Sequence, residues 1–460
     1  MKKRTIAFLA VFFLLLALPA LTIPLFSGGA NTENRTLAEF PAVWTEDGFN
    51  AGFFSGLDDW LADHIGFRSL LVAANSRWQA DLLGHSPEES VLVGKDGWLF
   101  YADTLNDYLN CPTLTPRAAY CAAHSLSMLQ SYAEAQGATF AAVIVPNKNT
   151  LYPDRMPARF VPADADGNLE LLTAAMDAEG VRYADLLPVF SSRQTAHYQS
   201  EDSHWTYQGA YLAWCELLRT LGRESRLGAL DFTWRVDWDG DLAAMLYGSG
   251  AKKCPQAYPD CEFSYRVTSH EKAEDALRLT TSCETGNCSA VIYRDSFFNT
   301  AQVYAAEEFE TVLFSRAYPY RAELIASQEA DVCILEIVER NLPNLARKAP
   351  VMPAPEASAP QDAAPLGGEI ACFCEVQGEL LHLYGTLPAA VLGESYRVIL
   401  ETEAGCFEAF PIFEQELLDA DTVGDNGFSA YLPPLIGTVT VYIATPAAAF
   451  VCSPIILPAE

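Results

Sequence analysis

The sequence predicts an α/β protein with a largely parallel sheet, followed by a small all-β module. Short apolar segments alternate with helical patterns from residue 116 to residue 340, and such alternation is typical of parallel sheets. A Pro/Ala-rich stretch, "APVMPAPEASAPQDAAPLGG", interrupts the chain at residues 349–368, and its composition predicts a semi-rigid linker. Beyond it lie strand patterns such as "GTVTVYIATPA", with no clear helix except at residues 414–420, which predicts a β-sandwich.

The individual elements of the α/β part follow from their patterns. An amphipathic stretch at residues 53–84 predicts one or two helices, and "VLVGKDGWLFY" alternates around a Lys-Asp-Gly turn, which predicts a hairpin. Thr206 is a suitable N-cap for the helix that follows it. Further helices are predicted at residues 116–136, 169–179 and 207–221. Another is predicted to end at residue 308, and one more lies near residue 322. Strands are predicted at "TFAAVIVPNK", "VRYADL", "SAVIYRDSFFN", "TVLFSR" and "DVCILEIVER".

The N-terminus predicts an exported chain that stays in the cell membrane. Three basic residues at positions 2–4 precede an uncharged and mostly apolar run at residues 5–30. A signal-peptide core has about 7–15 residues and a membrane-spanning helix needs about 20, so the length favours an uncleaved anchor. The basic flank indicates that everything after Ser27 lies outside the cytoplasm. A cleaved signal peptide and a secreted protein are the alternative.

The charge excludes one class of partner. The chain of 460 residues has a formal net charge of −30, which would repel the phosphate backbone, so nucleic-acid binding is not expected. Half of the residues are hydrophobic, which is enough for a large core in two or three domains. The composition therefore indicates a folded, non-nucleic-acid-binding protein.

Twelve cysteines are compatible with an oxidising compartment. Three pairs are spaced to close short loops: Cys111 with Cys121, Cys254 with Cys261, and Cys283 with Cys288. Cys372 and Cys374 alternate on a strand pattern, so they are expected to bond elsewhere or to stay buried. No paired Cys-x-x-Cys motifs occur, so a structural zinc site is not expected.

The segment "YQSEDSHWTYQGAYLAW" places an acid and an imidazole two residues apart, at Asp202 and His204. Side chains alternate on an extended segment, so these two are expected to point into one pocket. In nucleophilic catalysis the acid fixes the tautomer of the imidazole, and the imidazole takes the proton of the nucleophile. Ser296 in "VIYRDSFFN" is the candidate nucleophile, because it stands at a turn between a buried strand and a helix. Its backbone N–H and those of the next residues are expected to face the oxyanion.

Each of these residues also has a structural interpretation. Asp202 would cap a helix beside a structural histidine, and Ser296 would be a helix N-cap. A metal site needs a third ligand, and neither His197 nor His64 has the spacing of a metal motif, so no metal is predicted. The pairing of the serine with the Asp-x-His segment is what favours catalysis.

Several segments, taken in order, resemble a known family. "RDSFFN" resembles the nucleophile block of SGNH hydrolases, with Arg294 in place of the usual glycine. Together with "DSHWT", "ENRTLAEFP", "VLVGKDGWLFY", "VPNKNTLYP", "WDGDLAAML" and "EIVERNL", it is similar to the DHHW protein family and its relatives, the periplasmic alginate O-acetyltransferases. Ser203 stands where the family name has its first histidine. The resemblance spans about residues 33–345.

The resemblance implies a fold, a triad and a reaction. The fold is a circularly permuted SGNH-like domain, because the Asp-x-His segment precedes the serine in the chain. Asp202, His204 and Ser296 align with the family's catalytic triad, so the chain is expected to be an SGNH-type O-acetyltransferase or esterase. The expected reaction is O-acetyl transfer to hydroxyls of a cell-surface or secreted polysaccharide. A carbohydrate acetylesterase with the same triad and a non-catalytic glycan-binding or scaffold protein are the alternatives. No cofactor is expected, and the implied partner is a membrane-bound O-acyltransferase that supplies acetyl groups.

Four further residues are candidates for substrate binding. Asn147 and Lys148 close a strand at the expected active-site edge, where a turn-forming Asn and a solvated Lys are the structural alternative. Arg294 directly precedes the Asp-Ser pair of the nucleophile block. Asp241 in "WDGDL" is a candidate for either a substrate loop or a turn.

The chain is therefore expected to consist of four parts. They are a membrane anchor or signal segment at residues 1–30, an SGNH-like catalytic domain at residues 31–348, a linker at residues 349–368 and a β-rich module at residues 369–460.

Overall fold

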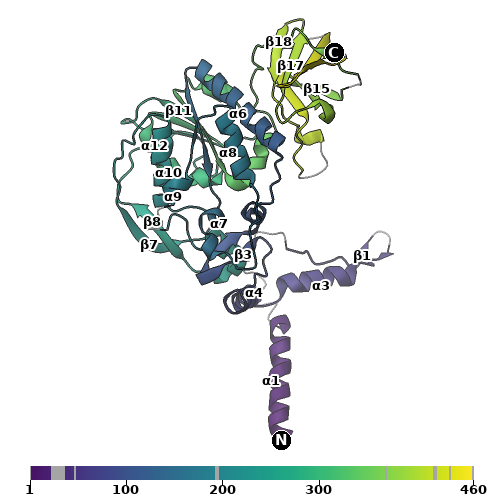
Figure 1. The fold of residues 1–460 in the computed structure, drawn as a ribbon. Coiled ribbons are helices and arrows are strands. Elements are labelled where there is room, and N and C mark those ends of the chain that lie inside the picture. The colour runs from purple at the N-terminus through teal and green to yellow at the C-terminus, as the bar shows by residue number, and fades with distance from the viewer. Residues whose placement is uncertain are drawn as a thin grey trace. The chain divides into compact units, whose positions relative to one another are not determined.

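The computed structural model describes residues 2–21, 37–45, 48–191, 196–367, 370–417, 422–434 and 437–457 (Figure 1). The chain divides into two compact units. The smaller unit consists of Met1–Ala102, Gln199–Ser203 and Arg235–Gln256. The larger unit consists of Asp103–Tyr198, His204–Trp234 and Ala257–Glu460.

The smaller unit is mostly helical. Its helices are α1 (Lys2–Leu21), α3 (Phe53–His64), α4 (Arg68–Arg77), which continues into a π-helical turn at Trp78–Leu82, and α11 (Asp241–Tyr247). Among the described residues, none of the helices has both the length and the hydropathy needed to cross a membrane. The anchor predicted at residues 1–30 lies partly outside the described residues, as does the start of "ENRTLAEFP".

Two short strand pairs also belong to the smaller unit. The strands β1 (Trp44–Thr45) and β2 (Gly48–Phe49) pair with each other, as do β3 (Val91–Val93) and β4 (Leu99–Tyr101). The β3–β4 hairpin confirms the prediction from "VLVGKDGWLFY". Asp96 and Gly97 in its turn have φ angles of 54° and 78°, which Asp and Gly tolerate better than most residues. A small apolar cluster joins this hairpin to α11.

A sheet of seven strands forms the centre of the larger unit. Its order is β6 (Tyr183–Ala184), β5 (Thr139–Val145), β13 (Val332–Val338), β11 (Ser289–Tyr293), β12 (Thr311–Ser315), β10 (Arg278–Ser282) and β9 (Arg266–Val267). The first five strands run parallel to one another. At the edge, β10 pairs antiparallel with β12, and β9 pairs antiparallel with β10. The largely parallel sheet that the sequence predicted is confirmed.

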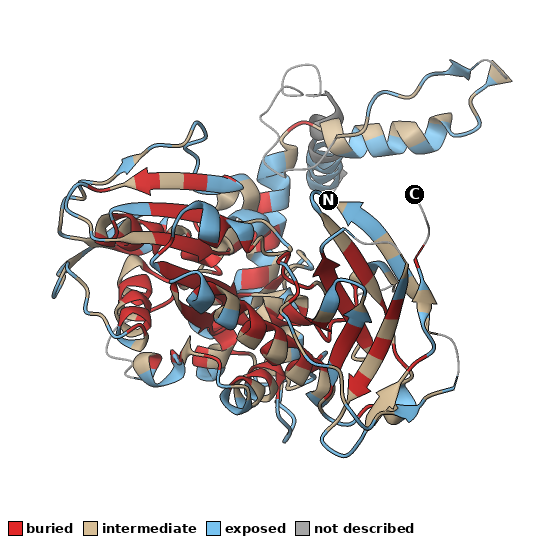
Figure 2. Ribbon diagram, turned by 90° about the horizontal axis from the view of Figure 1, so that it is seen from above, coloured by how far each residue is buried: buried red, intermediate tan, exposed pale blue. Residues whose placement is uncertain are grey.

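The central strands are apolar because both of their faces are covered. Every residue of β13 is buried, and so are six of the seven residues of β5. Figure 2 shows buried residues concentrated in the inner strands and helices of the molecule. The longer helices of the larger unit are α6 (Pro116–Ala135), α8 (Asn168–Ala178) and α10 (Tyr207–Thr220). Its short helices are α5 (Leu105–Tyr108), α7 (Lys148–Leu151), α9 (Leu187–Phe190), α12 (Gln302–Glu308) and α13 (Glu323–Ser327). Two further strands, β7 (Phe232–Trp238) and β8 (Cys254–Pro259), pair with each other outside this sheet.

Threonine caps begin two of the long helices. Thr206 accepts a hydrogen bond from Gly209 N at 3.0 Å at the start of α10, as the sequence predicted. Thr115 accepts one from Ala118 N at 3.0 Å at the start of α6. Proline follows Thr115, at a position where its missing N–H costs no hydrogen bond.

The C-terminal part is all-β, as predicted. One sheet contains β15 (Cys372–Gln377), β16 (Leu380–Thr386) and β19 (Gly427–Leu432). The other contains β14 (Ala364–Pro365), β21 (Ala449–Val451), β20 (Thr438–Ala444), β17 (Arg397–Thr402) and β18 (Gly405–Ala409), and β22 (Ile455–Ile456) pairs with β20. Where a helix was expected at residues 414–420, the chain makes one 3₁₀ turn at Gln415–Leu417, and residues 418–420 lie outside the described residues.

The first half of the Pro/Ala-rich stretch is hydrogen-bonded on both sides. Val351 N donates to Tyr320 O at 2.8 Å, which lies beyond the end of β12. Ala354 N then donates to Tyr431 O of β19 at 2.8 Å, and Pro355 O accepts from Glu408 N of β18. Residues 349–357 therefore pack against both parts of the larger unit, whereas the exact domain boundaries along the chain stay a prediction.

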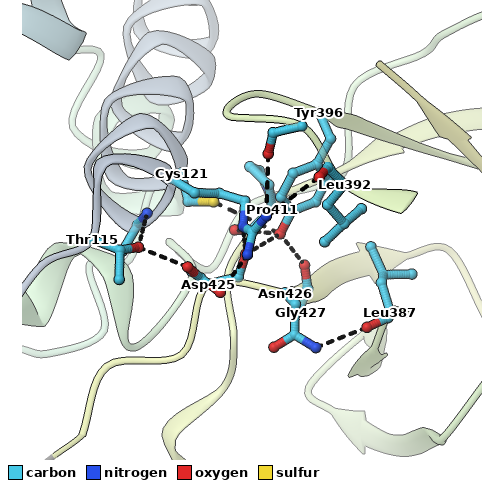
Figure 3. Close-up of polar contacts among 12 residues, drawn as sticks. Thr115, Cys121, Leu387, Leu392, Tyr396, Pro411, Asp425, Asn426 and Gly427 are labelled. Atoms are coloured by element: carbon cyan, nitrogen blue, oxygen red, sulfur yellow. Dashed lines mark hydrogen bonds and ion pairs between the residues drawn. The ribbon is translucent and has the colours of Figure 1, made fainter. Parts of the chain in front are cut away.

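The β-rich module is held to helix α6 by polar contacts. Arg117 forms an ion pair with Asp425 at 3.1 Å. Thr115 donates to the other oxygen of Asp425 at 2.7 Å (Figure 3). Cys121 lies 3.7 Å from the hydroxyl of Tyr396, which donates to Gly427 O at 2.8 Å (Figure 3). Beneath these contacts, buried residues of α6 and of β16, β17 and β19 belong to one hydrophobic cluster.

A second group of charges crosses the same interface. His124 of α6 contacts Glu179 through Nδ1 at 2.6 Å and Glu408 of β18 through Nε2 at 3.0 Å. Arg397 of β17 contacts both oxygens of Glu408. Burial opposes charge on the imidazole, but the hydrogen bonds to the two carboxylates raise the pKa of His124 to about 9. Burial likewise opposes charge on Glu408, yet Arg397 and His124 lower the pKa of this carboxyl to about 2.

The predicted loop disulfides are wrong. All twelve cysteines lie among the described residues, and none of them forms a disulfide there. Cys121 is buried on α6, where burial raises the pKa of its thiol to about 12, whereas Cys111 is exposed. Sequence spacing shows which loops a disulfide could close, but it does not show where the side chains point.

Candidate active site

Three parallel strands end at one edge of the central sheet. Val145 of β5 pairs with Val338 of β13, and Leu335 of β13 pairs with Tyr293 of β11. The loops that follow these strands therefore begin side by side. Ligands of open α/β sheets bind outside the carboxyl ends of the strands, so this edge is the expected place for a site.

Ser296 opens a sharp turn after β11. It begins a 3₁₀ helix at Ser296–Asn299, and α12 follows at Gln302. Asp295 caps the turn by accepting a hydrogen bond from Phe297 N at 2.8 Å. The strand–turn–helix setting is as predicted, but Phe297 N–H is already used by this cap. The expectation that the N–H groups after Ser296 all face an oxyanion is therefore wrong at Phe297.

His204 lies within hydrogen-bonding distance of Ser296. Its Nε2 is 3.1 Å from Ser296 Oγ. Its ring packs against the ring of Phe297, with the centroids 4.6 Å apart. Trp205, the next residue, donates from Nε1 to Phe297 O at 2.8 Å. The histidine and the serine are therefore held together by their neighbours in the chain as well as by their own contact.

His204 lies in a loop at residues 197–206, and backbone contacts join the two ends of this loop. Tyr198 and Trp205 form a β-bridge, and Thr206 N donates to His197 O at 2.7 Å. Gly209 lies so close to His197 O that an added Cβ would come within 2.3 Å of it. Residues 200–204 form bends rather than a strand, so the predicted extended segment is wrong. The bridge at Tyr198 and Trp205, not strand alternation, sets the position of His204.

Asp202 belongs to the smaller unit and is 3 % exposed. One of its carboxylate oxygens accepts hydrogen bonds from Trp238 Nε1 at 2.9 Å and from Asp241 N at 3.2 Å. The Asp241 carboxylate in turn accepts hydrogen bonds from Ser203 N at 2.7 Å and from the Ser203 hydroxyl. Asp241 thus holds the loop that carries Asp202, which favours the turn role over the substrate-loop role. Asp241 also borders an open cavity of about 900 Å³ that is lined mainly by α4 and α11.

Asn147 and Lys148 lie directly after β5. Asn147 N donates to Glu339 at 2.7 Å, and its side chain donates to Asp107 at 2.9 Å. Lys148 is only 5 % exposed, so the solvated lysine of the structural alternative is wrong. Burial raises the pKa of Glu339 to about 8, although the Asn147 N–H opposes the shift. Asn147 therefore links the ends of β5 and β13, and its role in substrate binding stays a prediction.

Arg294 is buried beside the nucleophile turn, with 4 % of its surface exposed. Its guanidinium donates to Asn299 at 2.6 Å, to Asp295 O at 3.3 Å and to Glu274 O. Burial lowers the pKa of Arg294 to about 10. These contacts join both ends of the turn to the segment at Glu274, and substrate binding by Arg294 stays a prediction.

Two residues beside Ser296 were not identified from the sequence as part of the site. Arg340 lies over the ring of Phe297, 5.1 Å from its centroid. Glu336 of β13 accepts a hydrogen bond from Asp295 N at 2.9 Å. Both lie in "LEIVERNL", where a glutamate inside an otherwise apolar strand is the signal that could have indicated a buried polar contact.

Comparisons with known proteins bear on this arrangement. Residues 91–279 match the family described as SGNH hydrolase-like domain, acetyltransferase AlgX. This range contains Asp202 and His204, whereas Ser296 lies beyond it. No curated protein matches the chain.

Three similar solved structures have low sequence identity to this chain. Bacillus cereus PatB1 with a sulfonyl adduct is 16 % identical, with 55 % of this chain and 95 % of that chain covered and a TM-score of 0.44. A DHHW family protein from Eubacterium siraeum is 13 % identical, with 55 % and 92 % covered and a TM-score of 0.42. Pseudomonas aeruginosa AlgX is 13 % identical, with 79 % and 94 % covered and a TM-score of 0.35.

The family match confirms the resemblance that the sequence motifs indicated. Residues 91–279 are similar to the SGNH hydrolase-like domain of the acetyltransferase AlgX, in agreement with the SGNH-type enzyme that the motifs predicted.

Proposed function

We propose that this protein transfers acetyl groups to hydroxyls of a cell-surface or secreted polysaccharide through an acyl-enzyme on Ser296. The observation that carries the proposal is the distance of 3.1 Å between His204 Nε2 and Ser296 Oγ at the carboxyl edge of the sheet. A serine paired with an imidazole can exchange acyl groups without a metal or an organic cofactor. The family match supports acetyl as the group transferred.

The proposed reaction has two steps. Ser296 Oγ attacks the acetyl carbonyl while His204 Nε2 takes the hydroxyl proton, and that proton leaves with the donor's leaving group. A sugar hydroxyl then gives its proton to His204 and attacks the acetyl ester, which breaks the bond to Ser296 Oγ and returns the proton to it. Asp202, two residues before His204 in the chain, is proposed to fix the tautomer of the imidazole.

The proposal includes a location and a donor. The basic residues at positions 2–4 and the apolar run after them favour export with residues 1–30 as an anchor in the cell membrane. An enzyme outside the cytoplasm lacks the cytosolic pool of activated acetyl groups. A membrane-bound O-acyltransferase that passes acetyl groups across the bilayer is therefore the proposed partner.

Transfer and hydrolysis differ only in the group that resolves the acyl-enzyme, so the test must measure both products. The purified full-length chain is incubated with a small acetyl ester, with and without oligosaccharides from surface polysaccharides, and with Ser296→Ala as the control. Acetylated oligosaccharide that increases at the expense of free acetate supports transfer. Acetate alone across a range of glycans, together with efficient deacetylation of an acetylated polymer, would instead identify an esterase.

A further inference from the structure

The carboxylate of Asp295 connects the nucleophile turn to the end of β13. One oxygen accepts from Phe297 N at 2.8 Å, within the turn itself. The other accepts from Val338 N at 3.0 Å and from Asn341 Nδ2 at 3.0 Å, both at the end of the neighbouring strand. This single side chain therefore fixes the Ser296 turn relative to the sheet.

Glu336 makes the reciprocal connection from the strand to the turn. It lies two residues before Val338 on β13 and is 1 % exposed. Its Oε2 accepts from Asp295 N at 2.9 Å, so each of the two carboxyl groups binds the backbone of the other's segment. Its Oε1 is buried and makes no hydrogen bond to the described residues. Burying a carboxyl group beside a second acid costs free energy of folding. Such an arrangement therefore calls for an explanation.

The surroundings of Glu336 favour the protonated form. Burial and the charge of Asp295 raise the pKa of Glu336 well above its ordinary value of 4.5, and the opposing effects of the Asp295 N–H and of Arg294 are smaller. Tyr198 and Tyr320 also interact electrostatically with Glu336. The position of Glu336 therefore favours its neutral, protonated form. A second negative charge here would oppose the oxyanion that forms beside Ser296.

We propose that Glu336 is a positioning residue for the nucleophile, because its carboxyl group holds Asp295 N and thereby keeps Ser296 at hydrogen-bonding distance from His204. It acts through acceptance of this hydrogen bond and not through a negative charge. The inference rests on the proposed function only in taking Ser296 as the nucleophile.

Two substitutions distinguish the role of Glu336 as a hydrogen-bond acceptor from any role of its acidity. Glu336→Gln keeps an oxygen acceptor of the same size and is neutral, whereas Glu336→Leu keeps the volume and loses the acceptor. We expect Glu336→Gln to retain turnover of a small acetyl ester within about 3-fold. Glu336→Leu is expected to lower kcat by about 100-fold with little change in KM, since displacing a reacting group by about 1 Å costs this much.

A matched control is another buried glutamate that binds backbone N–H away from the site. Glu308 is 3 % exposed and accepts from Arg226 N and from Ser225, and Glu308→Gln is expected to leave the rate unchanged. Equal losses in Glu336→Gln and Glu336→Leu would overturn the neutral-acceptor role. Wild-type rates in Glu336→Leu would overturn positioning altogether.

Two readouts do not depend on activity. The infrared band of a protonated carboxyl group is expected at pH 7 in the wild-type protein and is expected to decrease in Glu336→Gln, and its absence from the wild type would contradict the neutral acid. If Glu336→Leu does not fold, a large loss of turnover in Glu336→Gln or the absence of this band from the wild type still overturns the neutral-acceptor role. If the wild-type chain turns over no acetyl ester, the proposed function fails. A crystal structure of Glu336→Leu then tests positioning, because a displaced Ser296 supports it and an unchanged distance to His204 refutes it.

Discussion

Two buried glutamates of the larger unit show how neighbours decide the charge of an acid. Glu336 of β13 lies beside Asp295 at the nucleophile turn, and Glu408 of β18 lies between Arg397 and His124 at the interface with α6. Burial raises the pKa of both, yet the final pKa is well above 4.5 for Glu336 and about 2 for Glu408. The difference is the presence of cations at hydrogen-bonding distance.

The nucleophile turn and the interface between α6 and the β-rich module therefore contribute to the protein in different ways. At the nucleophile turn, carboxyl groups bind backbone N–H groups, so they set the geometry of a loop of a few residues. At the module interface, carboxylates bind cations from other elements, so they connect parts of the chain that lie far apart in sequence. We therefore expect substitutions at the turn to change catalysis with little effect on stability, and substitutions at the interface to do the opposite.

The largest effect is expected when the interface is removed altogether. The composition break predicts that a chain cut after Pro350 keeps a folded catalytic core. The structure instead includes residues of α6 and of the module in one hydrophobic cluster, and the cut would expose the part of it on α6. We now expect the truncated chain to lose its cooperative thermal transition and its near-ultraviolet circular dichroism.

A chain that begins at residue 22 is the control for this truncation, because residues 3–14 of α1 are exposed. It is expected to unfold cooperatively at nearly the wild-type temperature. Retention of both folding and ester turnover in the chain cut after Pro350 would show that the two regions are independent.

The next largest effect is expected at the nucleophile turn, where substitutions should lower the rate of turnover without changing stability. Ser296→Ala and His204→Ala should each lower acetyl-ester turnover at least about 1,000-fold, since members of a triad act as a unit. The double substitution should be little worse than either single one. Thermal denaturation is expected to be unchanged within a few degrees. Wild-type turnover in Ser296→Ala would disprove the nucleophile and remove the basis of the comparison.

Replacing the interface glutamate should give the reverse pattern. Glu408→Ala leaves Arg397 and His124 without their shared acceptor, and we expect a loss of about 2–3 kcal/mol in the free energy of unfolding. Urea denaturation measures it, with turnover of the native protein unchanged as the control. A loss of turnover without a loss of stability would mean that the module contributes to the site.

The two glutamates also predict pH dependences of opposite sign. The folded pKa of Glu408 is about 2 against an ordinary 4.5, so its stabilisation is complete above pH 4.5 and is lost as the pH falls towards 2. Glu336 has a raised folded pKa, so its contribution is most favourable below pH 4.5 and declines as the pH rises above that value. Urea denaturation from pH 3 to pH 8 should show that Glu408→Gln reduces the acid-side loss and that Glu336→Gln does not. Equal pH slopes for both variants would contradict the comparison.

Most of the fold could be predicted from local patterns. Strand β13 follows from an apolar run, the β3–β4 hairpin from a Lys-Asp-Gly turn, and the start of α10 from Thr206, because each signal lies within the element it predicts. The pairing of His204 with Ser296 came from ordered motifs that resemble a family. It could not come from spacing, since 92 residues separate the two.

The rest depends on contacts between distant segments. "LEIVER" shows a glutamate in a buried strand but does not show that the turn at Asp295 will cover it. In the same way, the Pro/Ala-rich composition is compatible with a free linker, and only the hydrogen bonds of residues 351–355 reveal a packed segment. The loop disulfides were wrong for the same reason, because short spacing does not bring thiols together.

The smallest expected effect compares two matched helix caps, one from each region. Thr206 at α10 accepts from Gly209 N at 3.0 Å and donates to His197 O at 3.2 Å, and it lies two residues after His204. Thr115 at α6 accepts from Ala118 N at 3.0 Å and donates to the charged Asp425 at 2.7 Å. Each Thr→Ala substitution should cost about 1 kcal/mol, as the loss of a cap usually does, and Thr115→Ala should cost a few tenths more for its bond to a carboxylate. Thr206→Ala should in addition lower kcat several-fold, because the loop closed at His197 also holds His204, whereas Thr115→Ala should leave kcat unchanged. Thr206→Ser keeps the hydroxyl and should restore the rate. Equal kcat values in Thr206→Ala and Thr115→Ala would show that the position of His204 does not depend on this cap, and that Tyr198 and Trp205 alone hold the loop.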